Sequence, residues 1–240
     1  ILNKNKIESQ MDNIKTIDYN FDSSFVIGLE SQKRNYELFY YHTNNIFIDS
    51  GVVKAKGFFL ELMDQKVNYF RFLSEKIEVK LEEFKFIFLR QDPPFNMHYI
   101  TSTYLLDCLP KSTTVINNPT AVRNAAEKIL PYKFKEFMPP TLISQRVEEI
   151  KIFFNRHKDI ITKPLYGNGG EGIHRSKNEY IEGINIDREY LEMQILAQKY
   201  IPEISEGDRR IIICDGYYVG YVARRTTDGR RTENFHAGGF

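Results

Sequence analysis

Residues 159–175 read DIITKPLYGNGGEGIHR, a glycine-rich turn between two segments with the composition of β-strands. Residues 159–164 carry β-branched side chains and end at a proline, and residues 172–176 form the second short segment. Glycine is used this densely where the backbone must come very close to a ligand or must move. The stretch therefore predicts a strand, a loop and a second strand, with Lys163 at the end of the first strand.

Gly167, Gly169 and Gly172 match the pattern G-x-G-x-x-G, which is a weak signal by itself. A dinucleotide-binding fold needs this loop to open a helix, but residues 172–180 have no apolar helical stripe. A P-loop needs Gly-Lys-Ser/Thr, which does not follow here. Two interpretations stay open at this point: a loop that folds over phosphates, with Lys163 neutralising their charge, and a hairpin with an exposed lysine.

The sequence around this loop indicates a domain of mixed helices and antiparallel strands. Residues 139–144 read as a short strand after a proline break, and residues 146–158 as a helix with one apolar face. Residues 208–225 read as a strand pair that turns at an Asp-Gly pair. We expect this α+β domain to span residues 123–240.

The preceding part of the chain alternates strands with helices. Residues 22–36 read as a helix capped by aspartate and serine, and residues 84–90 as a strand buried on both faces. This alternation predicts an open, mostly parallel α/β sheet over residues 1–122. An Asn-Pro pair at 118–119 predicts the start of a further helix that contains Lys128.

Composition limits the classes of partner. Lys+Arg number 33 and Asp+Glu 32, a net charge of +1, so no global field favours nucleic acid or an anionic membrane. No apolar run approaches the ~18 residues of a membrane span, and the first residues lack the apolar core of a signal peptide. Cys108 and Cys214 lack metal-binding spacing, and we expect two buried, reduced thiols in a cytoplasmic protein.

Further residues favour the phosphate-binding interpretation of the glycine loop. Lys128 supplies a second cation, and residues 198–203 end a strand at proline, which leaves a backbone edge for a planar base. Asp208 and Arg210 follow, a carboxylate for a ribose hydroxyl and a guanidinium for phosphate. In this order the features resemble the nucleotide site of an ATP-grasp protein.

The chain also resembles a particular family, the bacterial-type glutathione synthetases. The likeness extends from about Met11 to Phe240 and rests on these blocks: MDNIKTIDYNFDSSF (11–25), LRQDPPFNMHYITSTYLLD (89–107), NNPTAVRNAAEK (117–128), DIITKPLYGNGGEGIHR (159–175), AQKYIPEISEGDRRIIICDG (197–216) and NFHAGGF (234–240). It implies a pre-ATP-grasp domain followed by an ATP-grasp domain. It also implies ATP-dependent joining of γ-glutamylcysteine and glycine through an acyl phosphate, with Mg²⁺ or Mn²⁺, in a cytoplasmic homo-oligomer, expected to be a tetramer.

The resemblance implies roles for individual residues. Phosphoryl transfer needs alignment and charge neutralisation more than covalent help from the protein. The implied nucleotide-binding residues are Lys128, Lys163, Gly167, Gly169, Gly170, Gly172, the backbone of Lys199, Tyr200 and Ile201, and Asp208. The implied catalytic residues are Arg210 and Arg225, and the implied substrate-binding residues are Asp12, Asp92, Asn234, Gly238 and Gly239. Arg224 and Arg230 are interpreted as solvated charges at strand ends.

One departure from the family pattern concerns the metal. The family carries its magnesium ligands on later strands, so we expect them beyond Phe240 and none in this chain. Because the sequence begins with Ile and stops at HAGGF, we expect a fragment that does not turn over. The alternatives are another ATP-grasp ligase joining a carboxylate to an amine, which the DPPF block disfavours, and an inactive remnant that binds ATP.

Overall fold

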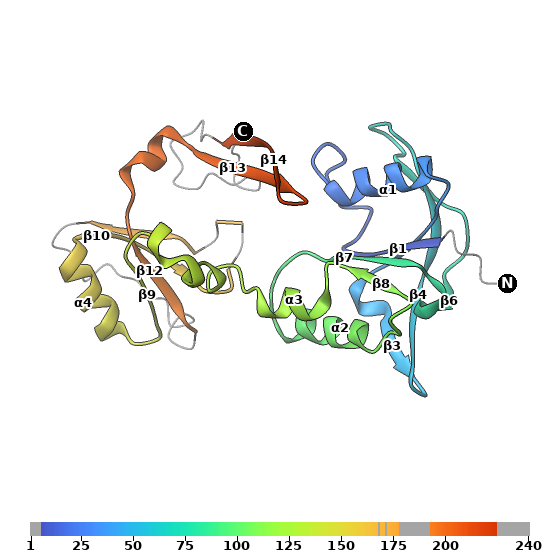
Figure 1. Ribbon diagram of the computed structural model, residues 1–240, viewed down its shortest axis with the longest axis horizontal. Coiled ribbons are helices and arrows are strands. Elements are labelled where there is room, and N and C mark those ends of the chain that lie inside the picture. Colours follow the sequence, from blue (N-terminus) through green and yellow to red (C-terminus); the bar gives the residue numbers. More distant parts are fainter. Residues whose placement is uncertain (1–5, 168, 171, 178–192, 225–240) are drawn as a thin grey trace. The chain divides into compact units, whose positions relative to one another are not determined.

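The computed structural model describes residues 6–167, 169–170, 172–177 and 193–224. The chain divides into two compact units, Ile1–Ala126 and Glu127–Phe240. Each unit has its own sheet and its own buried core, and each is described by itself below (Figure 1).

Unit 1 is an α/β sheet in the strand order β3-β4-β2-β1-β7-β8, with β5 and β6 both paired to β4. Strands β2, β1, β7 and β8 run parallel, and β3, β5 and β6 pair with β4 antiparallel. The strands are β1 (Lys6–Met11), β2 (Glu37–Tyr41), β3 (Ile46–Asp49), β4 (Val52–Leu62), β5 (Phe70–Phe72), β6 (Ile77–Lys80), β7 (Phe86–Arg90) and β8 (Thr114–Ile116). The prediction of an open α/β sheet is confirmed, but the sheet is mixed: β2, β1, β7 and β8 form its parallel part, and the pairings of β4 are antiparallel.

Helices cover both faces of this sheet (Figure 1). On one face Phe25 of α1 (Ser23–Lys33) packs with Leu38 and Leu60, and on the other Leu106 of α2 (Met97–Asp107) packs with Phe39 and Ile87. The remaining helical elements of unit 1 are α3 (Pro119–Asn124) and the 3₁₀ turns η1 (Thr43–Asn45) and η2 (Leu81–Glu83). Helix α1 begins as predicted, because the Asp22 carboxylate accepts the Phe25 N–H at 2.9 Å.

The chain changes direction across the sheet beside β1. From β1 it passes through α1 to β2 on one side, and later returns to β7 on the other side of β1. The carboxyl ends of β1 and β7 therefore flank a topological switch point, the place where open α/β sheets bind ligands.

Unit 2 contains an antiparallel sheet in the order β11-β10-β12-β9 and a separate hairpin of β13 and β14. Helix α4 (Val147–His157) packs on the sheet through Ile150, Phe153 and Phe154, which are buried with Ile160. The other elements are η3 (Leu130–Phe137), β9 (Thr141–Ser144), β10 (Asp159–Pro164), β11 (His174–Lys177), β12 (Ile195–Lys199), η6 (Pro202–Glu206), β13 (Asp208–Cys214) and β14 (Tyr217–Arg224).

Two expectations are wrong. Lys128 does not lie in a helix, because α3 ends at Asn124 and residues 127–129 form a turn. Only Pro119 of α3 is buried, and helix-forming residues without a packed face do not sustain a longer helix. Cys108 and Cys214 are free but exposed rather than buried. Cys108 follows the last turn of α2, and Cys214 ends β13 in a hairpin whose side chains are mostly exposed.

Candidate functional site

The glycine loop joins β10 to β11, which pair antiparallel with Thr162 opposite His174. Gly169, Gly170 and Gly172 have φ values of 62°, 85° and 68°, a region that side chains with a Cβ disfavour. The loop starts from a tight turn in which the N–H of Gly167 donates to the carbonyl of Pro164 at 3.3 Å. The predicted strand, glycine loop and strand are confirmed.

Two lysines lie beside this loop. Lys128 Nζ donates to the carbonyl oxygens of Leu165, at 3.2 Å, and of Gly167. Burial lowers the pKa of Lys163, and the positive charge of Lys128 lowers it further, against an opposing effect of Glu127. Burial also lowers the pKa of Lys128. The structure thus brings together two cations, Lys128 and Lys163, that are 35 residues apart in sequence.

Among the described residues, no carboxylate forms an ion pair with either of these two cations. Lys163 Nζ lies 3.5 Å from the neutral Gln198 Oε1, and the partners of Lys128 are carbonyls. Neither lysine belongs to any salt bridge found within the described ranges of the chain. Glu127 offsets part of their charge without forming an ion pair within the described ranges. Partly buried like charges that lack a paired carboxylate favour a bound anion, because an anion relieves both their repulsion and their desolvation.

The backbone predicted to meet a base follows β12. The N–H of Lys199 donates to Pro140 O at 2.9 Å, and that of Tyr200 to Asp159 O at 3.0 Å. These two donors are therefore used within the sheet, whereas the Ile201 N–H has no backbone acceptor among the described residues. The Tyr200 ring lies against the guanidinium of Arg175, a residue that the sequence did not single out.

The hairpin of β13 and β14 places Asp208 directly opposite Arg224. Arg224 Nε donates to Asp208 Oδ1 at 2.6 Å and Nη2 donates to Oδ2, and the Arg224 side chain is only 15% exposed. The interpretation of Arg224 as a solvated charge is therefore wrong. No local sequence signal indicates this pair, because it depends on the register across the hairpin. Arg210, one of the predicted catalytic residues, is exposed on β13.

Unit 1 brings Asp12 and Asp92 together at its switch point. The N–H of Asp92 donates to Asp12 Oδ2 at 2.6 Å, across 80 residues of sequence. Arg90, the last residue of β7, lies nearby: its Nη2 donates to Ser23 Oγ at 2.6 Å and its Nε to Ser24 Oγ at 3.0 Å. The sequence analysis missed Arg90, although an arginine that ends a buried strand at a carboxyl edge is a usable signal.

The remaining predicted site residues lie outside the described residues; these are Arg225, Asn234, Gly238 and Gly239. Within the described part of the chain, no group of three or more His, Cys, Asp or Glu side chains is arranged to hold a metal ion. In the same part of the chain, no helix has both the length and the apolar composition to cross a membrane.

Comparisons with known proteins show the family. Residues 6–123 match the family "Prokaryotic glutathione synthetase, N-terminal domain", and residues 127–240 match "Prokaryotic glutathione synthetase, ATP-grasp domain". The glutathione synthetase of Agrobacterium fabrum is 41% identical over 233 residues, covering 96% of this chain and 73% of that protein. The glutathione synthetase of Mesorhizobium japonicum is 37% identical, covering 98% of this chain and 76% of that protein.

Solved structures resemble the chain at much lower identity. D-cycloserine synthetase DcsG aligns with a TM-score of 0.61 at 11% identity, covering 91% of this chain and 68% of that one. D-alanyl-alanine synthetase A from Vibrio cholerae aligns with a TM-score of 0.58 at 12% identity, covering 94% of this chain and 69% of that one. At these identities the likeness shows the fold alone.

Proposed function

The chain belongs to the prokaryotic glutathione synthetase family, and we propose that it is the ATP-dependent ligase that joins γ-glutamylcysteine to glycine. The single observation that carries the proposal is the pair of unneutralised lysines, Lys128 and Lys163, beside the glycine loop. That arrangement suits the phosphates of ATP. Members of the family use ATP with Mg²⁺, which supplies further neutralisation of the phosphate charge when bound.

The phosphate end of the nucleotide is assigned to unit 2. Lys163 and Lys128 hold the phosphates by charge-assisted hydrogen bonds, which are shorter and stronger than neutral ones. Lys128 gives up its bonds to the Leu165 and Gly167 carbonyls as it turns to the phosphates. The released glycine loop folds over the phosphates and excludes water from the reacting group.

The base and the ribose follow along the same unit. The Ile201 N–H and the carbonyls of the extended segment 199–201 meet the adenine edge. Asp208 accepts from the ribose hydroxyls while Arg224 holds its carboxylate in place. Arg210 and Arg225 face the transferring phosphoryl group and the peptide carboxylates.

The reaction moves the terminal phosphoryl group from ATP to the cysteinyl carboxylate of γ-glutamylcysteine, and ADP leaves. The amine of glycine then attacks the carbonyl carbon of the acyl phosphate, forming the amide bond and releasing phosphate. The chain contributes charge neutralisation and alignment rather than a covalent intermediate with the protein. Because an acyl phosphate hydrolyses in water, closure of the loop protects it.

The peptide substrate is assigned in part to unit 1. A γ-glutamyl group carries both an ammonium and a carboxylate, and the switch point presents charges of both signs. Asp12 and Asp92 suit the ammonium, and Arg90, which two serine hydroxyls hold in place, suits the carboxylate. Asn234, Gly238 and Gly239 are assigned to the peptide by resemblance to the family. We further propose a cytoplasmic homo-oligomer, and the two free thiols are in keeping with a reducing compartment.

Phosphate release and glutathione formation test this proposal. The 240-residue chain and a form continued through its own reading frame are each given ATP, Mg²⁺, γ-glutamylcysteine and glycine. Phosphate release that requires both γ-glutamylcysteine and glycine, with glutathione as the product, supports the ligase. If ATP binds to both forms and neither releases phosphate with any combination of peptide and amine, the proposal is overturned and the inactive ATP-binding protein is supported.

A further inference from the structure

Arg175 joins three segments of unit 2 that are far apart in sequence. Its Nε donates to Asp159 Oδ1 at 2.8 Å and its Nη2 donates to Asp159 Oδ2 at 2.7 Å. Its guanidinium carbon lies 3.4 Å from the centroid of the Tyr200 ring. Arg175 belongs to β11, Asp159 begins β10, and Tyr200 follows β12 directly. The strand that leaves the glycine loop is thereby tied to the segment assigned to adenine.

Asp159 holds Tyr200 by a second route. Its backbone carbonyl accepts the Tyr200 N–H at 3.0 Å, while its carboxylate accepts both bonds from Arg175. Tyr200 is therefore fixed through its backbone by Asp159 and through its ring by Arg175. Both routes end one residue before Ile201, whose N–H is proposed to face the base.

This cluster has the features of a precise clamp rather than of a loose surface pair. The Arg175 and Asp159 side chains are only 21% and 26% exposed, and the two parallel bonds match the planar fork of a guanidinium. The bonds to Asp159 also raise the pKa of Arg175, so the cation stays charged over the whole physiological range. A lysine has one ammonium centre and can neither form the fork nor lie flat on the ring.

We propose that Arg175 is a positioning residue for the nucleobase: it fixes Tyr200, and with it the backbone of residues 199–201, in the conformation that recognises adenine. This inference rests on the proposed function, since it assumes that the nucleotide lies between the glycine loop and that segment. The lysines that hold the phosphates do not depend on the clamp. Loss of the clamp therefore weakens the hold on the base and leaves the hold on the phosphates unchanged.

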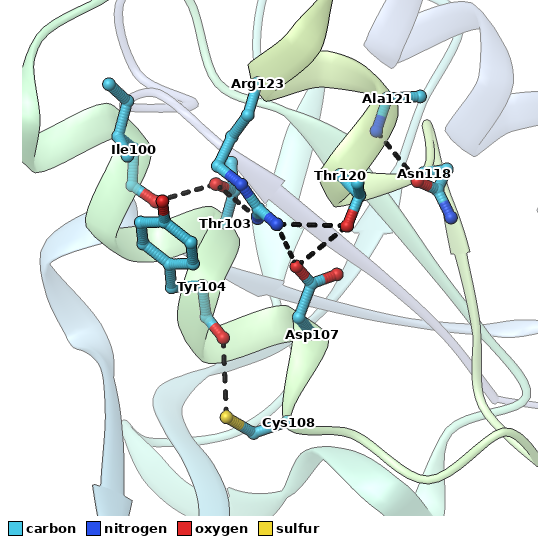
Figure 2. A network of polar contacts seen from close by, with 9 residues as sticks. All are labelled: Ile100, Thr103, Tyr104, Asp107, Cys108, Asn118, Thr120, Ala121 and Arg123. Carbon is cyan, nitrogen blue, oxygen red and sulfur yellow. Dashed lines mark hydrogen bonds and ion pairs between the residues drawn. The ribbon is translucent and has the colours of Figure 1, made fainter.

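A matched control exists in unit 1, where Arg123 makes the same kind of cluster. Figure 2 shows its guanidinium beside the carboxylate of Asp107, the hydroxyls of Thr103 and Thr120, and the ring of Tyr104. The guanidinium carbon lies 4.2 Å from the centroid of that ring. This cluster joins α2 to α3 and has no assigned role at the nucleotide.

The test compares two probes by isothermal titration calorimetry, ATP with Mg²⁺ and inorganic tripolyphosphate with Mg²⁺. For Arg175→Lys we expect the Kd for ATP to rise about tenfold, as expected when a charge-assisted pair and a ring contact are lost. The Kd for tripolyphosphate should stay within about twofold of the wild-type value. Arg123→Lys should leave both values unchanged. Asp159→Asn, which keeps the backbone carbonyl and weakens the fork, should repeat the ATP-selective loss.

The opposite results are distinguishable from one another. Equal losses for ATP and tripolyphosphate, or no loss for ATP in either Arg175→Lys or Asp159→Asn, would overturn the positioning role while leaving ATP binding itself established. Failure of the wild-type chain to bind either probe would overturn the proposed function, and the positioning role with it. Circular dichroism on each variant shows whether it is folded, and an Arg175→Lys protein that does not fold is replaced by Asp159→Asn in the comparison.

Discussion

Glu8 lies at the centre of the sheet of unit 1, and its burial predicts a specific dependence of stability on pH. Its side chain is fully buried, and neither carboxylate oxygen has a hydrogen-bond partner among the described residues. Its Cα partners on the neighbouring strands are Phe39 of β2 and Ile87 of β7, both in the apolar core. Burial raises the pKa of Glu8 well above its ordinary value of 4.5, so the native state keeps this proton to a higher pH than the unfolded chain does.

The sign and the size of the effect follow from proton linkage. Below pH 4.5 the carboxyl is neutral in both states, and it adds no pH dependence. Above that value the unfolded chain releases the proton and the native state keeps it, so the free energy of unfolding falls as pH rises. The slope is about 1.4 kcal/mol per pH unit, and it persists up to the raised pKa. Tyr41, whose own pKa is raised by burial and by Glu8, is the titratable neighbour, and it stays neutral over this range.

The test is Glu8→Leu, which replaces the acid with an apolar side chain suited to its surroundings. The free energy of unfolding of Glu8→Leu minus that of the wild type should increase by about 1.4 kcal/mol for each pH unit above pH 5. Glu8→Gln should show the same pH dependence as Glu8→Leu. Its free energy of unfolding should be lower than that of Glu8→Leu at every pH, because its amide donors are buried without partners. Urea unfolding at each pH, with a deuterium pulse measured on peptides covering β1, follows unit 1 separately. A difference between Glu8→Leu and wild type that stays constant from pH 5 to pH 6 would refute the reasoning.

Three further predictions concern the proposed site. Lys163→Met should raise the Kd for ATP tenfold or more in calorimetry, whereas Lys151→Met, at an exposed position, should leave that Kd unchanged. Because the pKa of Lys163 is lowered, ATP affinity should fall as rising pH deprotonates this lysine, and Lys163→Met should remove that fall. Gly172→Ala places a Cβ at a φ of 68°, which costs about 1 kcal/mol and should lower ATP affinity about fivefold, whereas Gly220→Ala, with open space around it, should have no effect. Asp12→Asn keeps an oxygen for the Asp92 N–H but loses the charge, so the Kd for γ-glutamylcysteine should rise about tenfold with the Kd for ATP unchanged; equal changes in both would contradict the separate assignment of peptide and nucleotide.

Local signals predicted much of the fold, and the misses share a physical cause. The helix at α1 and the Asp-Gly turn between β13 and β14 follow from capping and turn chemistry that a short window contains. The pairing of β5 and β6 with β4 could not be read from the sequence, because it depends on contacts between distant segments. Gly57 illustrates this: a Cβ there would lie 2.1 Å from the carbonyl of Tyr40, yet nothing near Gly57 in sequence signals that contact.

The same limit applies to the candidate site. The glycine loop and both lysines were predicted, because each has a signature in its own segment. The helix expected around Lys128 was wrong, yet its Nζ still reaches the loop, because a turn also brings a flexible side chain close. Arg175 and the pairing of Arg224 with Asp208 were missed, since each depends on which residues lie opposite one another across a hairpin.

Two kinds of partly buried cation differ in their partners within the described part of the chain. Arg123, Arg175 and Arg224 each form a close pair with an aspartate, so their charge is neutralised within the protein. Lys128 and Lys163 are partly buried against carbonyl and amide oxygens without such a partner. Burial lowers the pKa of both lysines, and the charge of Lys128 lowers the pKa of Lys163 further, so the charged form of each is less favourable than it is in water. An arriving phosphate would remove that cost as well as form new bonds, and this is why we propose the lysines rather than the arginines as the phosphate-binding residues.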